Sequence, residues 1–187
     1  MDAYIIHIAT LAAIYVILAL SLNLVVGYAG LLSVTHAAFF GFGAYATAIL
    51  LTAHDVNFFV SIILGMIVSG LSALFVGYVL SRFKGDYYAL GSFGFNIIVY
   101  SIFLNIDELT RGPLGIPGIG RPEFFGVSFS DNFSFLLLTL AFALAIFFIS
   151  QFIAGSSFGR VLKAIREDEQ AIAVFGYRTH RYKLAIF

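Results

Sequence analysis

Five long runs of apolar residues limit what this chain can fold into more than any other feature of its sequence. They are residues 3–26, 34–53, 58–80, 87–106 and 133–154. A helix needs about 20 apolar residues to cross the hydrocarbon core of a membrane. Hydrophobic residues make up 61% of the 187 and charged residues 11%, against roughly 45–50% and about 25% in soluble domains. We therefore predict an all-α fold, a polytopic bundle of transmembrane helices, in residues 1–154.

The second of these runs is ambiguous. It begins within GYAGLLSVTHAAFFGFGAY, where glycines and polar residues precede the apolar part. Non-helical backbone at membrane depth is tolerated only where protein or a water-filled cavity covers its polar groups. The sequence leaves two alternatives for residues 34–53, a complete transmembrane helix or a broken, re-entrant segment.

Lysine and arginine in the connecting loops predict the orientation of the spans. Arg82 and Lys84 lie in the short turn after the third run, and more basic residues follow the fifth: Arg160, Lys163, Arg166, Arg178, Arg181 and Lys183. Short loops rich in these residues stay in the cytoplasm. We therefore expect an outer N-terminus, an extracytoplasmic loop at 107–132 and a cytoplasmic segment at 155–183. Residues 184–187 are expected to begin a further span that is cut off.

Several classes of function are disfavoured by what the sequence lacks. The chain has no cysteine and a net charge of zero, which excludes thiolate metal sites and argues against a nucleic-acid partner. The predicted spans hold no Asp, Glu, Lys or Arg, although ion-coupled carriers often use such groups. The sequence has no H-E-x-x-H, no G-x-S-x-G and no Walker-type phosphate loop. We predict no enzyme activity, no cofactor and no metal.

Small residues recur at helical spacing in two of the predicted spans. In lipid, such a stripe lets two helix backbones approach closely. The third span carries a stripe with steps of four residues: Ser61, Gly65, Ser69, Ala73 and Gly77. The second span carries a similar one, with two phenylalanines (Phe39 and Phe42) predicted to point toward lipid or a partner: Ala37, Gly41, Ala44 and Ala48. We predict helix packing along both stripes, with sliding during transport as the functional alternative.

Three polar residues at or near membrane depth are candidates for a translocation path. Asn96 lies near the middle of the fourth span, Ser92 lies one turn earlier, and His36 opens the second span. Polar groups inside a bilayer are costly and mark either pathways or hydrogen bonds between helices. Both interpretations stay open for Asn96, and a hydrogen bond at the helix end is favoured for His36.

The segment after the fifth run changes character. Ser156 or Ser157 can cap a helix start, and Gly176 can end that helix in the left-handed conformation. Between residues 160 and 176, charged residues alternate with a broken apolar face. The sequence predicts one helix here, which is either a solvated juxtamembrane helix or a docking element for a cytoplasmic partner.

The outer loop holds every proline of the chain within TRGPLGIPGIGRPE, residues 110–123. Proline fixes φ and glycine allows positive φ, so we predict a compact non-helical loop at the membrane surface. The candidate residues of this loop are Gly112, Pro113, Gly115, Pro117 and Gly118.

Four stretches together resemble one family. GRVLKAIREDEQAIAVFG followed by RYKLAIF resembles the cytoplasmic coupling segment of ABC importer permeases of the branched-chain amino acid type. GYAGLLSVTHAAFFGFGAY, GDYYALGSFGF and RGPLGIPGI also resemble that family, in the same order along the chain. The most similar class is the M-type permease subunit. Some positions depart from its pattern: Ile97, Tyr100, Arg111, Gln170 and Ile172.

The resemblance implies partners and a role for the cytoplasmic segment. It implies a sister permease, two cytoplasmic ATP-binding subunits, an extracytoplasmic substrate-binding protein, and a bacterial or archaeal inner membrane. It also implies branched-chain or other hydrophobic amino acids as substrate, a longer parent chain, and substrate delivery near the outer loop. A secondary carrier or channel for a small polar solute such as urea or an amide is the alternative. The residues expected to couple to the ATPases are Arg166, Glu169, Ala171, Phe175 and Gly176.

Overall fold

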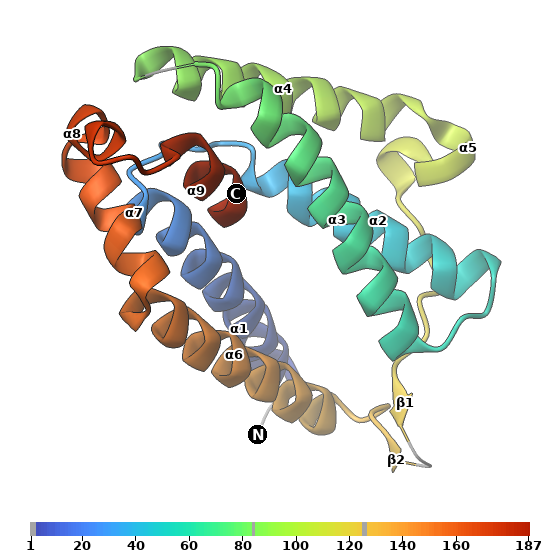
Figure 1. The fold of residues 1–187 in the computed structure, drawn as a ribbon. Coiled ribbons are helices and arrows are strands. Elements are labelled where there is room, and N and C mark those ends of the chain that lie inside the picture. Colours follow the sequence, from blue (N-terminus) through green and yellow to red (C-terminus); the bar gives the residue numbers. More distant parts are fainter. Residues whose placement is uncertain (1–2, 84, 125–126) are drawn as a thin grey trace. The chain divides into compact units, whose positions relative to one another are not determined.

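The computed structural model describes residues 3–83, 85–124 and 127–187. These residues are predominantly helical, which confirms the predicted all-α class (Figure 1). The chain divides into two compact units, one formed by Met1–Leu32 with Glu123–Phe187 and the other by Ser33–Pro122. The predicted boundary between the spans and the segment at 155–183 stays a prediction, and that segment lies in the same compact unit as the first and fifth apolar runs.

Five helices in the described residues are long and apolar enough to cross a membrane. Both ends of each of these candidate spans lie within two residues of the ends of the corresponding predicted run. The helices are α1 (Ala3–Asn23, extended by the π-helix η1, Leu24–Tyr28), α2 (His36–Ala53), α3 (Phe58–Leu80), α4 (Asp86–Asn105) and α6 (Asn132–Gly155). Helix α2 is unbroken over 18 residues, so the helical alternative is confirmed for the second run, and the non-helical residues lie before it.

In the first unit, α1 and α6 pack side by side. Helix α7 (Ser157–Glu167) follows α6 directly and also packs on η1, at the end of α1. The two spans therefore run parallel and end at the same side (Figure 1). The remainder of this unit consists of α8 (Glu169–Val174), α9 (Thr179–Ile186) and a short antiparallel hairpin of β1 (Glu123–Phe124) and β2 (Val127–Ser128).

In the second unit, α2 and α3 form a closely packed helical hairpin. Ser61, Gly65 and Ala73 of the predicted α3 stripe are buried. A Cβ at position 65 would meet the Thr47 side chain and would lie 2.9 Å from the Gly43 carbonyl oxygen. The close approach of the backbones therefore requires glycine, and the packing prediction for α3 is confirmed.

The predicted packing face of α2 is confirmed at two of its four residues: a Cβ at Gly41 would meet the Phe103 ring, and Ala48 is buried. The prediction is wrong for the other two, Ala37 and Ala44, which are exposed, and for Phe39, which was predicted to face outward and is buried. The Ser69 hydroxyl donates to the Phe39 carbonyl oxygen over 2.9 Å, and Phe42 packs edge-on against Phe103 of α4. Small residues occur on every side of α2, so their spacing did not identify the face that meets α3.

The predicted extracytoplasmic loop of the second unit contains more helix than predicted. A short helix, α5 (Asp107–Thr110), is followed by a 3₁₀ turn, η2 (Gly112–Leu114). The expectation of a wholly non-helical loop is therefore wrong for residues 112–114. Pro113 occupies the first turn of η2, where its missing N–H costs no hydrogen bond.

Candidate functional site

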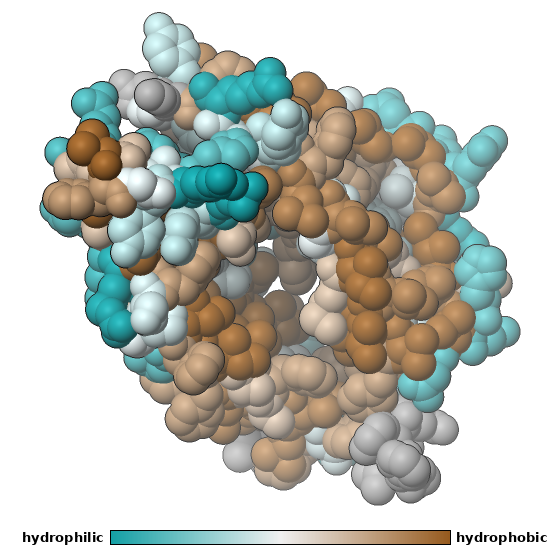
Figure 2. Space-filling model, viewed as in Figure 1, coloured by the Kyte–Doolittle hydropathy of each residue, from teal (hydrophilic) through white to brown (hydrophobic). Residues whose placement is uncertain are grey.

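The segment α7–α9, predicted to be cytoplasmic, holds most of the basic residues of the chain. In Figure 2 hydrophilic and hydrophobic residues are mixed on the surface of this segment, while hydrophobic residues dominate the surface of the spans. The segment begins with a sharp turn from α6. The Ser156 hydroxyl donates to the Ile153 carbonyl over 2.6 Å and accepts from the Gly159 N–H over 3.2 Å. Ser156 is therefore the N-cap of α7, as predicted.

The turn also requires glycine at position 159. A Cβ there would lie 2.5 Å from the carbonyl oxygens of Ile153 and Ala154. Beyond this point α7 is strongly amphipathic. Leu162 and Ile165 are buried, and the basic residues of the helix lie on its exposed side. The apolar face fixes α7 against the rest of its unit.

The predicted single helix over 160–176 is wrong because it breaks at Asp168. Asp168 has extended backbone angles, with φ −151° and ψ 98°. Its carboxylate accepts from the N–H groups of Gln170 and Ala171, both over 2.9 Å. An aspartate that binds these two orphan donors stabilises a new helix start more than a continued helix. The result is a separate short helix, α8.

Helix α8 ends at Gly176 in the predicted left-handed conformation, with φ +87°. The Gly176 N–H donates to Ala173 and the Tyr177 N–H donates to Ile172, over 3.0 and 3.4 Å. This pair of bonds is a Schellman motif. It leaves Val174 86% exposed and Phe175 78% exposed. We name Val174 and Phe175 the apolar tip.

Helix α9 packs on α7 and α8 through one ion pair and an aromatic contact. Glu169 accepts from the Lys183 ammonium over 2.6 Å and from the Thr179 hydroxyl over 3.1 Å. The rings of Phe158 and Tyr182 stack with their centroids 5.5 Å apart. The Glu169 side chain is therefore engaged within the segment.

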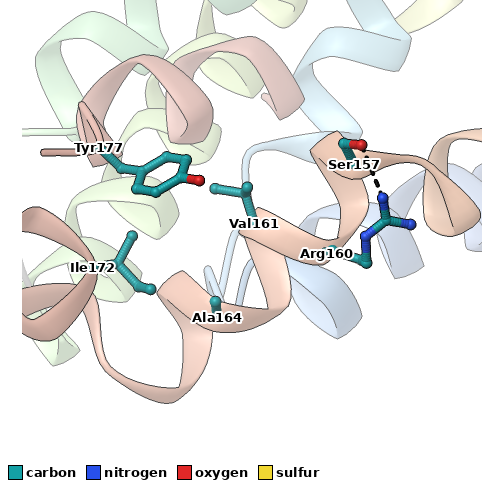
Figure 3. A pocket seen from close by; sticks show the side chains of 6 residues that line it. All are labelled: Ser157, Arg160, Val161, Ala164, Ile172 and Tyr177. Carbon is teal, nitrogen blue, oxygen red and sulfur yellow. Dashed lines mark hydrogen bonds between the residues drawn. The ribbon is translucent and has the colours of Figure 1, made fainter. Parts of the chain in front are cut away.

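A cavity of about 370 Å³ opens between α7 and α8 (Figure 3). Arg160 lies at its edge, where its guanidinium donates to the Ser157 hydroxyl and the Gly155 carbonyl over 2.8 and 3.0 Å. The lining residues are Ser157, Arg160, Val161, Ala164, Ile172 and Tyr177. The cavity therefore presents an apolar wall with one cationic group beside it.

The other predicted coupling residues lie apart from the tip or contribute backbone only. Arg166 is near the end of α7 and donates from its guanidinium to the Gly27 carbonyl of η1. Ala171 lies in the first turn of α8, where its N–H binds Asp168. Phe175 and Gly176 thus form the exposed end of the segment, whereas Arg166 and Glu169 hold other parts of the same unit.

Of the predicted path residues, Ser92 is fully buried in α4. Its hydroxyl accepts from the Val34 N–H over 3.1 Å and donates to the Ala89 carbonyl over 2.7 Å. It thereby binds the non-helical backbone that precedes α2. Asn96 lies one turn further along α4 and is half-buried, and His36 is the first residue of α2. A role in translocation stays a prediction for these three residues.

Among the described residues of the predicted outer loop, three glycines occupy positions where the backbone has a positive φ. Gly112 is buried at φ +54°, and its N–H donates to the Thr110 hydroxyl over 3.2 Å. Gly115 and Gly118 also have positive φ, +67° and +79°. Pro113 and Pro117 are exposed. The loop is therefore held in one shape by local bonds at its start.

The residues of η1 and the glycine that follows it were not predicted as part of the site. Gly27, Tyr28 and Gly30 lie opposite α7 and contact its basic side chains. The only local signal was the glycine pair just after the first apolar run. Asp168 was also missed as a cap, although aspartate before a short helix is a known start signal.

Five helices in the described residues are able to span a membrane, and they are joined to a segment that ends in an exposed apolar tip, as in a multi-pass membrane protein. The chain belongs to the family described as the permease component of the branched-chain amino acid transport system, whose model matches residues 4–187. The members of this family are described as permease components of a transport system, and that description names no enzyme activity.

Two curated relatives are similar over almost the whole chain. They are the high-affinity branched-chain amino acid transport system permease protein LivM of Salmonella typhimurium strain LT2 and that of Escherichia coli strain K12. Each is 34% identical over 206 aligned positions, which include 97% of this chain and 48% of the relative. The chain thus spans about half the length of these relatives. No solved structure matches it significantly.

Proposed function

We propose that this chain is part of the permease of an ATP-driven importer that carries branched-chain or other hydrophobic amino acids across the inner membrane. The family and the names of the two relatives support the substrate class. The sequence contains no Walker-type phosphate loop, so ATP hydrolysis of that kind belongs to separate subunits.

The apolar tip is the observation that carries this proposal. Apolar surface rimmed by polar residues is suited to contact with another protein, and Val174 and Phe175 are exposed next to charged residues. Here two caps, Asp168 and Gly176, hold α8 and its tip in one orientation. A rigid short helix of this kind can seat in a groove on an ATP-binding subunit and transmit rigid-body motion. Two such subunits would serve the permease pair.

The spans support a sister permease and lipid as the remaining neighbours. In the most apolar window of each span, between 11% and 17% of residues are buried within this chain. The rest of each helix surface is apolar and needs lipid or another membrane helix beside it. On the outer side, the loop with Gly112, Pro113 and Gly118 is the proposed port for a substrate-binding protein, and Asn96 is the proposed path residue.

The test uses the longest natural chain that contains this sequence, reconstituted with its sister permease, ATP-binding subunits and binding protein. Labelled leucine uptake should require ATP and should survive ionophores that collapse ion gradients. Isoleucine and valine should compete, and urea should not. Uptake that survives ATP removal and stops with the ionophores would identify a secondary carrier instead. Competition by urea alone would overturn the substrate class.

A further inference from the structure

The end of the first span and helix α7 contact each other through side chains that are far apart in sequence. Arg166 donates to the carbonyl oxygen of Gly27, 139 residues earlier in the chain. The Lys163 ammonium lies 4.9 Å from the centroid of the Tyr28 ring, within the range of a cation–π interaction. Both basic residues project from α7 onto η1, which we name the α7–η1 contact.

The backbone of η1 explains why this carbonyl needs a side-chain donor. The last carbonyls of a helix have no following turn to supply N–H groups. After η1 the Leu31 N–H donates to Val25 over 3.3 Å, six residues back and past Gly27. The Arg166 guanidinium provides a charged donor to Gly27 instead, and charged donors make stronger hydrogen bonds than neutral ones.

Gly30 makes room for the arginine. Its φ is +67°, a conformation that other residues rarely adopt. A Cβ at this position would lie 2.8 Å from Arg166 Cγ. Two separate requirements, positive φ and space for the arginine stem, therefore favour glycine where the chain leaves the first span.

The π-helix marks this end of the span as unusual. π-Helical turns are rare and frequently lie at functional positions. Here η1 occupies the last five residues of the first span, Leu24–Tyr28, and faces the helix that leads to the apolar tip. Arg160, on the same helix, instead donates to Ser157 and to Gly155 at the turn between α6 and α7.

We propose that Arg166 is a positioning residue that ties α7 to the π-helical end of the first span. Movement of the cytoplasmic segment then reaches α1 directly, and not only through the covalent link from α6 to α7. The two parallel spans of this unit would follow α7 together. This inference rests on the proposed coupling of α8 to an ATPase, and it assigns Arg166 to transmission inside the permease and not to the ATPase interface.

The test compares Arg166→Ala with Arg160→Ala in the reconstituted complex described above. Three quantities are measured: ATPase subunits retained on purification, ATP hydrolysed, and leucine imported. With Arg166→Ala the retained ATPase should match wild type, while ATP consumed per leucine should rise roughly tenfold, as expected when one coupling contact is lost. Arg166→Lys, which keeps one charged donor, should give a smaller rise. Arg160→Ala, which removes bonds at the α6–α7 turn and leaves the α7–η1 contact in place, should raise the ratio much less than Arg166→Ala.

A second variant distinguishes loss of the α7–η1 contact from a folding defect of Arg166→Ala. Gly30→Ala displaces the arginine stem without removing the charge, and it should also raise ATP consumed per leucine. If Arg166→Ala lowers membrane abundance, Gly30→Ala decides the question alone. An unchanged ratio in the variants that reach the membrane would overturn the proposal, and so would loss of ATPase from the Arg166→Ala complex. Failure of the proposed function would look different, because wild type itself would then show no ATP-dependent uptake.

Discussion

The α2–α3 contact and the α7–η1 contact join helices by opposite means. Between α2 and α3, glycine and small hydroxyl residues bring the backbones together, and the hydroxyls of Thr47 and Ser69 donate to the carbonyls of Ser61 and Phe39 on the facing helix. Between α7 and η1, two long basic side chains bridge the gap. In lipid, close packing drives helix association, whereas at the aqueous edge long side chains can bridge helices and keep their charge hydrated. We therefore expect the α2–α3 contact to hold its two helices at a fixed separation. The α7–η1 contact allows small shifts, because long side chains can change conformation.

The largest effect is expected at Gly65. Gly65→Leu should destabilise the α2–α3 hairpin by about 1–3 kcal/mol, the usual cost of overpacking, because the new side chain would meet Thr47 and the Gly43 backbone. Thermal unfolding in detergent measures it. Gly70→Leu on the same helix is the matched control, since a Cβ there meets nothing within 4 Å. Equal losses in both variants would remove close packing as the explanation.

The next largest effect concerns the apolar tip. Phe175→Ala should weaken ATPase association by more than 1 kcal/mol, about tenfold in affinity, as for a buried aromatic anchor at an interface. The ring is 78% exposed in this chain, so thermal stability of the permease itself should hardly change. Binding of purified ATPase to the reconstituted permease measures the effect. Wild-type affinity together with lowered stability would show that the ring packs inside the permease instead.

The smallest effect is expected at the ion pair between α8 and α9. Glu169→Gln should cost at most about 1 kcal/mol, because partly exposed ion pairs contribute little and the two side chains are 34% and 17% exposed. The loss should shrink at high salt. Thermal unfolding at low and high ionic strength measures it. A large, salt-independent loss would mean that this pair holds the segment together more strongly than its exposure allows.

The spans could be predicted closely because hydropathy is a property of each stretch by itself. The ends of α3 were predicted correctly, and the α3 stripe was identified because its small residues keep one strict spacing. The face of α2 that meets α3 was not, because small residues surround α2. To choose among the possible packing faces of α2, one must know which helix packs against it. The spacing of residues within α2 does not give that information.

In the candidate site too, some features could be predicted from the sequence and others could not. Gly176 was predictable, since glycine after a helical run commonly ends a helix in the left-handed conformation. The break between α7 and α8 at Asp168 was not predicted, because charged residues lie on both sides of it. The contact of Arg166 with Gly27 joins residues 139 positions apart. The sequence around either residue does not indicate that the other is its partner.

The central claim is that a rigid cytoplasmic tip couples this permease to an ATPase. Gly176→Val tests it most directly, because a β-branched residue in the left-handed conformation costs of order 1 kcal/mol and should disturb the helix end that orients Phe175. Gly176→Asn, which tolerates that conformation, is the matched control; a Cβ at this position meets nothing within 4 Å. In the reconstituted complex, Gly176→Val should lower both ATP-driven uptake and ATPase retention, while Gly176→Asn should stay close to wild type. Normal uptake with normal ATPase retention in Gly176→Val would contradict the account and leave α7–α9 as a solvated segment without a coupling role.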